Sequence, residues 1–143
     1  MPDRIFENIC AQLDLGRLLL PPVRLSGGLM HNMFSLETTR GRYAVKLLNP
    51  HVMLRPEAKA NFDTAERLEE ILEKYGIPIL PALTFQHKKM QELDGQYFYL
   101  FPWYDGRALK SGGIKEFHCA EVGRILALIH NIDKREAPFV RNE

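Results

Sequence analysis

The sequence contains few of the residues that build disulfide frameworks and metal centres. Only two cysteines occur among its 143 residues, Cys10 and Cys119, and they form no CxxC pair. The five histidines are scattered, and His118 and His130, 12 positions apart, have no third ligand near them in the sequence. Zinc sites need a closer set of ligands. We therefore expect two free thiols and no metal site in this chain.

An excess of charge and a long hydrophobic run are also missing. Nineteen Lys and Arg against eighteen Asp and Glu give a net charge of +1, which offers no general attraction to nucleic acid or to an anionic membrane. No run has the length of a transmembrane helix, and the residues after Met1 lack the apolar core and cleavage site of a signal peptide. With 45% hydrophobic and 26% charged residues, we expect a cytoplasmic globular protein without nucleic-acid or membrane partners.

What the sequence does contain is a clear succession of helical and strand patterns. Apolar residues recur at helical spacing in a leading helix of residues 3–16, in a long helix of residues 56–75 and in a last helix of residues 114–131. Alternating patterns predict strands at about 23–26, 33–38, 42–48, 90–93 and 97–101, the last two joined by Asp94-Gly95. We predict an α+β fold with a five-stranded antiparallel sheet and one long helix packed on it.

Two glycines between strands and a lysine in a later strand are the first candidates for chemistry. Gly27-Gly28 allows backbone N–H groups to turn toward a phosphate, although an ordinary hairpin turn would use the same residues. Lys46 follows 19 positions after Gly27 in an apolar strand, where a solvated edge lysine is the alternative. In protein kinases a strand lysine holds the α- and β-phosphates and pairs with a helix glutamate. Glu66 fits that role.

The choice of Glu66 rests on its place in the long predicted helix. It lies 20 positions after Lys46, between Ala65 and Leu68, which we expect to face the core. Glu57 and Glu69 are rivals, because a helix boundary inferred from sequence shifts by a few residues.

Several segments, in this order and spacing, resemble the aminoglycoside phosphotransferase and choline-kinase-like family. They are Leu25-Ser26-Gly27-Gly28-x-x-x-Asn32-x-Phe34, Tyr43-Ala44-Val45-Lys46, Glu66, Gly76-Ile77-Pro78, Phe101-Pro102-Trp103-Tyr104-Asp105-Gly106 and Gly123-Arg124-Ile125-Leu126-Ala127-Leu128-Ile129-His130-Asn131-Ile132-Asp133. The resemblance spans about residues 20–133 and rests on all of them together.

The resemblance implies a kinase-like amino-terminal lobe that binds ATP. Gly27, Gly28 and Asn32 would line the phosphates, Lys46 would orient them, and Glu66 would fix Lys46.

The base would lie at a hinge formed by Phe101 to Trp103, whose backbone groups would meet adenine. Leu25, Phe34 and Ala44 would supply apolar surface for the purine, although cores use the same residue types. Trp103 is expected to pack in the hinge rather than to cage a cationic substrate, although a choline-type cation would favour an aromatic face.

The catalytic residues that the family would require are not in this chain. Phosphoryl transfer needs a loop of the His-x-Asp-x-x-x-x-Asn type and a later acidic residue for magnesium. None of the five histidines is followed two places on by Asp. We therefore expect Mg²⁺ to serve the complete enzyme, with its ligands absent here, and we expect this chain alone to be inactive.

The resemblance divides the chain into two parts. Residues 1–103 would form the kinase-like lobe, with the leading helix at 3–16 and the ATP-binding sheet and helix at 20–103. Residues 104–143 would hold the hinge exit and the first helix of a truncated carboxyl-terminal lobe. Because the 114–131 helix is apolar almost all round, we expect an exposed apolar patch on it and a surface for self-association.

The function implied is transfer of the ATP γ-phosphoryl group to a hydroxyl of a metabolite or an aminoglycoside-type compound. Fold does not fix the acceptor. The alternatives are a stand-alone nucleotide-binding or protein-interaction module without catalysis, and an α+β domain that only resembles a kinase lobe.

Overall fold

The computed structural model describes residues 3–26 and 30–136, which group into two compact units. One unit takes its described residues from Met1–Ala58 and Pro81–Tyr104, and the other from Lys59–Leu80 and Asp105–Glu143. The first unit ends at Tyr104, and most of the long helix belongs to the second unit. The division expected between residues 103 and 104 stays a prediction.

The first unit contains the five-stranded antiparallel sheet, in the order β1-β2-β3-β5-β4. The strands are β1 (Val23–Leu25), β2 (Asn32–Thr38), β3 (Gly41–Leu47), β4 (Gln91–Leu93) and β5 (Gln96–Pro102). Asp94 and Gly95 have φ values of 49° and 81°, as a two-residue hairpin turn with left-handed residues requires. The predicted α+β fold class and its five strands are confirmed.

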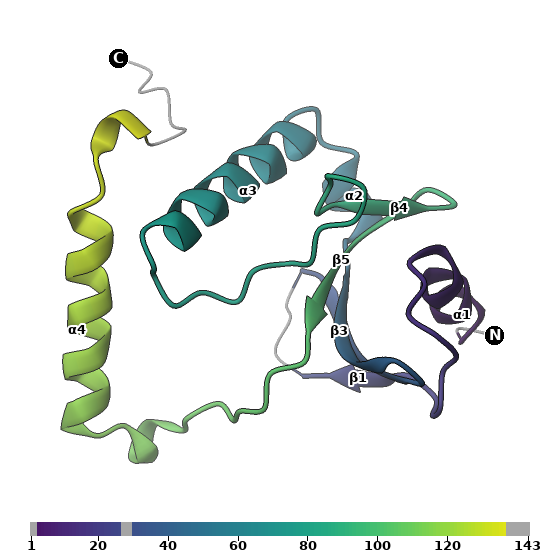
Figure 1. Ribbon diagram of the computed structural model, residues 1–143, viewed down its shortest axis with the longest axis horizontal. Coiled ribbons are helices and arrows are strands. Elements are labelled where there is room, and N and C mark those ends of the chain that lie inside the picture. Colours follow the sequence, from purple (N-terminus) through teal and green to yellow (C-terminus); the bar gives the residue numbers. More distant parts are fainter. Residues whose placement is uncertain (1–2, 27–29, 137–143) are drawn as a thin grey trace. The chain divides into compact units, whose positions relative to one another are not determined.

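The leading helix, α1 (Asp3–Gln12), lies against one face of this sheet (Figure 1). Its buried side chains share a core with side chains of β2, β3 and β5. That core contains Phe6, Ile9, Cys10, Leu13, Leu15, Leu36, Val45, Phe98 and Leu100. Burial of this many apolar side chains is the main source of stability for the unit.

The leading helix ends earlier than its predicted limit at residue 16. Asp14 takes the left-handed conformation with φ of 54°, and the N–H of Leu15 donates to the carbonyl of Cys10 at 2.9 Å. These are features of a helix stop in which one left-handed residue closes the last turn. The expected stop at Gly16 was wrong because an aspartate can occupy this conformation as well.

A short helix, α2 (Pro50–Met53), was not predicted. Asn49 caps it by accepting a hydrogen bond from the N–H of His51 at 2.9 Å, and Pro50 occupies the first helical position. Four residues are too few to produce a helical repeat of apolar side chains, so the segment had no periodic signal.

The second unit contains the two longer helices. These are α3 (Ala58–Lys74) and α4 (Glu116–His130), accompanied by the short turns η1 (Ser111–Gly113) and η2 (Lys134–Glu136). Gly76 has φ of 68° and ends α3, as the sequence predicted. Both long helices lie within two residues of their predicted bounds.

The apolar side chains of α4 are exposed on several sides of the helix. No residue of α4 is buried, and Phe117, Val122 and Leu126 are 63%, 57% and 48% exposed. This agrees with the apolar patch that the sequence predicted. In the part of the chain that the structure describes, no helix combines the length and apolar character needed to cross a membrane.

A polar contact joins the end of α3 to η2 within the second unit. The carboxylate of Glu136 accepts hydrogen bonds from the Lys74 ammonium and the Tyr75 hydroxyl, each at 2.8 Å. These two donors lower the pKa of Glu136, which keeps its carboxyl group ionised. This contact ties the segment that follows α4 to the end of α3.

Candidate functional site

Lys46 shares one face of the sheet with three other residues of the predicted nucleotide site. In an antiparallel pair, residues directly opposite each other point to the same face, and so do residues two apart on one strand. Ala44 lies opposite Phe101, and Lys46 lies opposite Tyr99 and Met33. Met33 in turn lies opposite Leu25. We call this side of the sheet, with Leu25, Ala44, Lys46 and Phe101, the Lys46 face.

Phe34 does not lie on the Lys46 face. It lies opposite Val45, whose side chain is fully buried on the side covered by α1, here called the α1 face. The ring of Phe34 is 4.8 Å from the ring of Phe6, between centroids, at a tilt of 57°. The expectation that Phe34 contacts the purine is therefore corrected: pleating points it into the α1 core.

Asn32 is likewise placed by the alternation of β2. It lies opposite Leu47, one position away from the residues of the Lys46 face, and its side-chain oxygen accepts a hydrogen bond from Arg24 at 2.8 Å. Gly27 and Gly28, the predicted phosphate-binding glycines, lie outside the described residues. Among the described residues predicted to contact the phosphates, Lys46 therefore lies on this face of the sheet and Asn32 does not.

The predicted hinge continues β5 and keeps contact with β3. The N–H of Trp103 donates to the carbonyl of Arg42 at 3.2 Å, and the Arg42 guanidinium lies 3.7 Å from the centre of the indole ring. This cation–π contact gives Trp103 a packing role, which the sequence had favoured over a substrate cage.

In the hinge, the carbonyl of Pro102 is a hydrogen-bond acceptor at the edge of β5 that faces away from β3. Leu100 accepts a hydrogen bond from the N–H of Leu83 at 2.7 Å, on the side away from β3. Because backbone carbonyls alternate along a strand, the carbonyl of Pro102 points to the same edge as that of Leu100. Pro102 has no N–H, so its contribution there is an acceptor.

His31 stands directly before β2 and was not expected from the sequence to be a site residue. Its Nδ1 accepts a hydrogen bond from the N–H of Asn49 at 3.0 Å. Partial burial and, less strongly, the positive charge of Lys46 lower the pKa of His31. The only signal in the sequence was the place of His31 between Gly27-Gly28 and β2.

Glu66, the expected partner of Lys46, lies on α3 in the second unit. Glu66 and Glu69 are three positions apart, share one side of the helix and are both half-buried, whereas Glu57 precedes the helix and is exposed. Ala65, expected to face the core, is exposed. The pairing of Glu66 with Lys46 stays a prediction.

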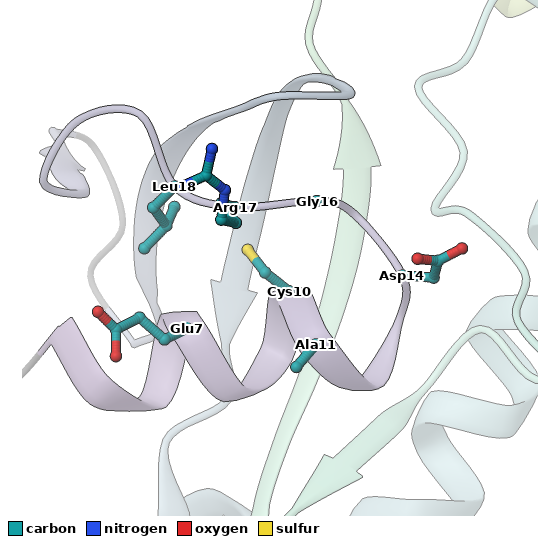
Figure 2. A pocket seen from close by; sticks show the side chains of 7 residues that line it. All are labelled: Glu7, Cys10, Ala11, Asp14, Gly16, Arg17 and Leu18. Carbon is teal, nitrogen blue, oxygen red and sulfur yellow. The ribbon is translucent and has the colours of Figure 1, made fainter.

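A pocket of about 510 Å³ lies in the first unit between α1 and the segment that follows it (Figure 2). Glu7, Cys10 and Arg17 are among its lining residues, and Figure 2 shows the Cys10 thiol pointing from α1 toward Arg17 and Leu18. Burial, and secondarily the charge of Glu7, raise the pKa of the Cys10 thiol. Since α1 covers the α1 face, this pocket is separate from the Lys46 face.

An apolar pocket of about 430 Å³ lies within the second unit. It is lined by Leu68, Ile71, Leu72, Ile129, His130, Ile132, Asp133 and Lys134.

The described residues contain no group of three or more His, Cys, Asp or Glu side chains that could hold a metal ion. A site for a metal ion is therefore not assigned to these side chains.

Comparison with known proteins gives a family and a fold. The model of the phosphotransferase enzyme family matches residues 23–143. A crystal structure of a candidate aminoglycoside phosphotransferase from Ralstonia eutropha JMP134 matches with a TM-score of 0.61 at 16% sequence identity. The match covers 94% of this chain, which spans 40% of the length of that structure. The comparison with curated proteins gives no match.

Proposed function

Because the chain belongs to the phosphotransferase enzyme family, we propose that it is the ATP-binding portion of a small-molecule kinase. Its five-stranded sheet and helices have the fold of a kinase-like amino-terminal lobe, as the resemblance implied. The complete protein transfers the γ-phosphoryl group of ATP to a hydroxyl of a metabolite or an aminoglycoside-type compound. The observation that carries this proposal is the placement of Lys46 on one face with Ala44 and Phe101, at the strand that enters the hinge.

Each residue of the Lys46 face has a role that follows from its chemistry. The Lys46 ammonium neutralises and orients the phosphates, which a charged donor does more strongly than a neutral one. Leu25, Ala44 and Phe101 offer apolar surface to the purine, and the small side chain of Ala44 leaves room for the ring. The carbonyl of Pro102 accepts from the adenine amino group, and Glu66 is the expected partner of Lys46.

Magnesium and the acceptor are not assigned to these residues. The described residues contain no set of side chains that fits a metal ion, so no step is derived through Mg²⁺. The catalytic aspartate and the acceptor contacts are expected outside the 143 residues, since no His-x-Asp loop occurs among them.

Binding of ATP to a Lys46→Ala variant tests this proposal. Trp103 is the one tryptophan in the sequence, so its fluorescence reports on the hinge without a label. We expect ATP to change this fluorescence and Lys46→Ala to weaken ATP binding at least about tenfold, because a hydrogen bond to a charged group is lost. Lys88→Ala, which removes an exposed charge from the turn before β4, is the matched control and should bind like the unaltered protein. Equal affinities for all three proteins would contradict the proposal.

A second candidate function is a nucleotide-binding module without catalysis that pairs with a second copy of itself through α4. The exposed apolar side chains Phe117, Val122 and Leu126 favour it. Light scattering during gel filtration tests this candidate. A dimer that becomes a monomer in Leu126→Glu would support it, and a monomer at all concentrations would exclude it.

A further inference from the structure

The pocket of about 510 Å³ beside α1 has a size that is typical of small-molecule sites. It lies between α1 and the segment that follows this helix, and its apolar lining includes Cys10, Ala11 and Leu18. Cys10 is 2% exposed, and Figure 2 shows its thiol pointing from the helix toward that segment. The innermost part of the pocket is therefore apolar.

The wall of the pocket opposite α1 is held by hydrogen bonds to the turn between β2 and β3. The N–H of Arg17 donates to the hydroxyl of Thr39 at 3.1 Å, and the N–H of Thr39 donates to the carbonyl of Arg17 at 2.9 Å. The hydroxyl of Thr38 donates to the carbonyl of Leu15 at 2.6 Å. Gly16 has φ of 83°, and a Cβ there would clash with the Thr39 hydroxyl. This wall is already in place before any ligand binds, which lowers the cost of binding.

Two groups of opposite charge stand on the two walls of the pocket. Glu7 lies on α1 and Arg17 on the facing segment, and both side chains are exposed. Among the described residues, neither of these side chains has a partner in a hydrogen bond or an ion pair. Asp14, the third charged residue of the lining, is paired with Arg40 and points away from the other lining side chains in Figure 2. A ligand would therefore meet one carboxylate and one guanidinium that are not already neutralised.

The charges and the apolar lining together define the chemistry of a matching ligand. A carboxylate pairs with an ammonium group, and a guanidinium pairs with a carboxylate through two parallel hydrogen bonds. Because Glu7 and Arg17 lie on opposite walls, the ligand needs its two charges at opposite ends and an apolar body between them. A dipeptide with free termini and apolar side chains has this arrangement, whereas a free amino acid carries both charges close together.

We propose that this pocket binds an apolar dipeptide. The amino terminus of the dipeptide pairs with Glu7, its carboxylate pairs with Arg17, and its side chains contact Cys10 and Leu18. This binding is independent of the proposed ATP site, because α1 covers the side of the sheet opposite to the Lys46 face.

Titration of the labelled protein with L-leucyl-L-leucine, followed by amide NMR, tests where the dipeptide binds. We expect the amide signals of Cys10, Arg17 and Leu18 to shift and that of Ala44, on the Lys46 face, to stay in place. L-leucine should bind at least about tenfold more weakly, because it cannot pair with both charged groups at once. Shifts that are confined to the Lys46 face, or no shifts at millimolar dipeptide, would overturn the proposal.

Two variants test the charged contacts separately. Glu7→Gln and Arg17→Gln should each bind L-leucyl-L-leucine about tenfold more weakly, since each loses a hydrogen bond between charged groups. The matched controls are Glu70→Gln and Arg67→Gln, which alter exposed charges of α3 and should bind like the unaltered protein. Unchanged affinity in either pocket variant, or equal losses in the controls, would overturn the proposal.

A ligand that lacks the ammonium group assigns the contact of Glu7 without relying on a variant alone. N-acetyl-L-leucyl-L-leucine keeps the carboxylate and the apolar side chains. We expect it to bind the unaltered protein about tenfold more weakly than the free dipeptide does, and to bind Glu7→Gln with the same low affinity. A further loss in Glu7→Gln would contradict the proposed pairing of this residue with the amino terminus.

Discussion

At the residue scale, the ionisation of His31 links the candidate site to the stability of the fold. The pKa of His31 is lowered from its ordinary value of about 6.5, so the folded protein binds this proton less readily than the unfolded chain does. Stability from this group is therefore present above about pH 6.5 and is lost as the pH falls through the lower folded pKa.

We expect the free energy of unfolding to decrease on acidification below about pH 6.5. Urea unfolding at a series of pH values measures this decrease, and His31→Asn, which has no titrating ring, should show a smaller one. An identical dependence on pH in both proteins would show that other groups are responsible.

The two cysteines should differ strongly in reactivity. Cys10 is 2% exposed and its pKa is raised by burial and by Glu7, whereas Cys119 is exposed on α4. The thiolate is the reactive form, so iodoacetamide at pH 8 should modify Cys119 well before Cys10. Mass spectrometry of the labelled peptides follows both sites. Urea should remove the difference, and equal labelling of the folded protein would contradict the buried position of Cys10.

At the element scale, two exposed glycines of the second unit should respond to alanine in opposite directions. Gly76 has φ of 68° at the end of α3, where a side chain is strained, whereas Gly123 lies inside α4. A Cβ would meet nothing within 4 Å at either position, so backbone conformation decides the outcome. We expect Gly76→Ala to destabilise by about 1 kcal/mol and Gly123→Ala to stabilise by up to about 1 kcal/mol.

Thermal unfolding of the two variants measures these changes. A shift of the same sign in both would contradict the assigned end of α3.

Some helices and strands could be predicted from the sequence and others could not. Alternation and the Asp94-Gly95 turn were enough to predict five antiparallel strands, because pleating and turn conformation are local properties. The helix stop at Asp14 and the short α2 were missed, since neither depends on periodicity. Phe34 was assigned to the wrong face because its place relative to Lys46 depends on strand register, which its residue type does not reveal.

At the scale of the whole molecule, the candidate site depends on residues from distant parts of the sequence. The register of four strands, β1, β2, β3 and β5, brings Leu25, Ala44, Lys46 and Phe101 to one face. Leu25 and Phe101 were identified in the sequence only by residue type and resemblance. The partner role of Glu66 was predicted from its spacing in the sequence and stays a prediction, because Glu66 lies in the second unit and Lys46 in the first.

The chain spans 40% of the length of the solved structure that it resembles. Its described α4 exposes apolar side chains, and its residues include no catalytic loop of the His-x-Asp type. Nucleotide binding and catalysis can therefore be tested separately. Binding is proposed for described residues such as Lys46 together with Gly27 and Gly28, which lie outside the described residues, and catalysis is proposed for the complete protein.

A map of ATP binding by amide NMR tests directly whether the Lys46 face is the nucleotide site. ATP added to the labelled protein should shift the amide signals of Ala44, Lys46 and Phe101 on the Lys46 face. The signals of Phe6 and Ile9, in α1 on the opposite face, should remain where they were. Shifts confined to α1, or no shifts at millimolar ATP, would contradict the assignment of the Lys46 face as the nucleotide site.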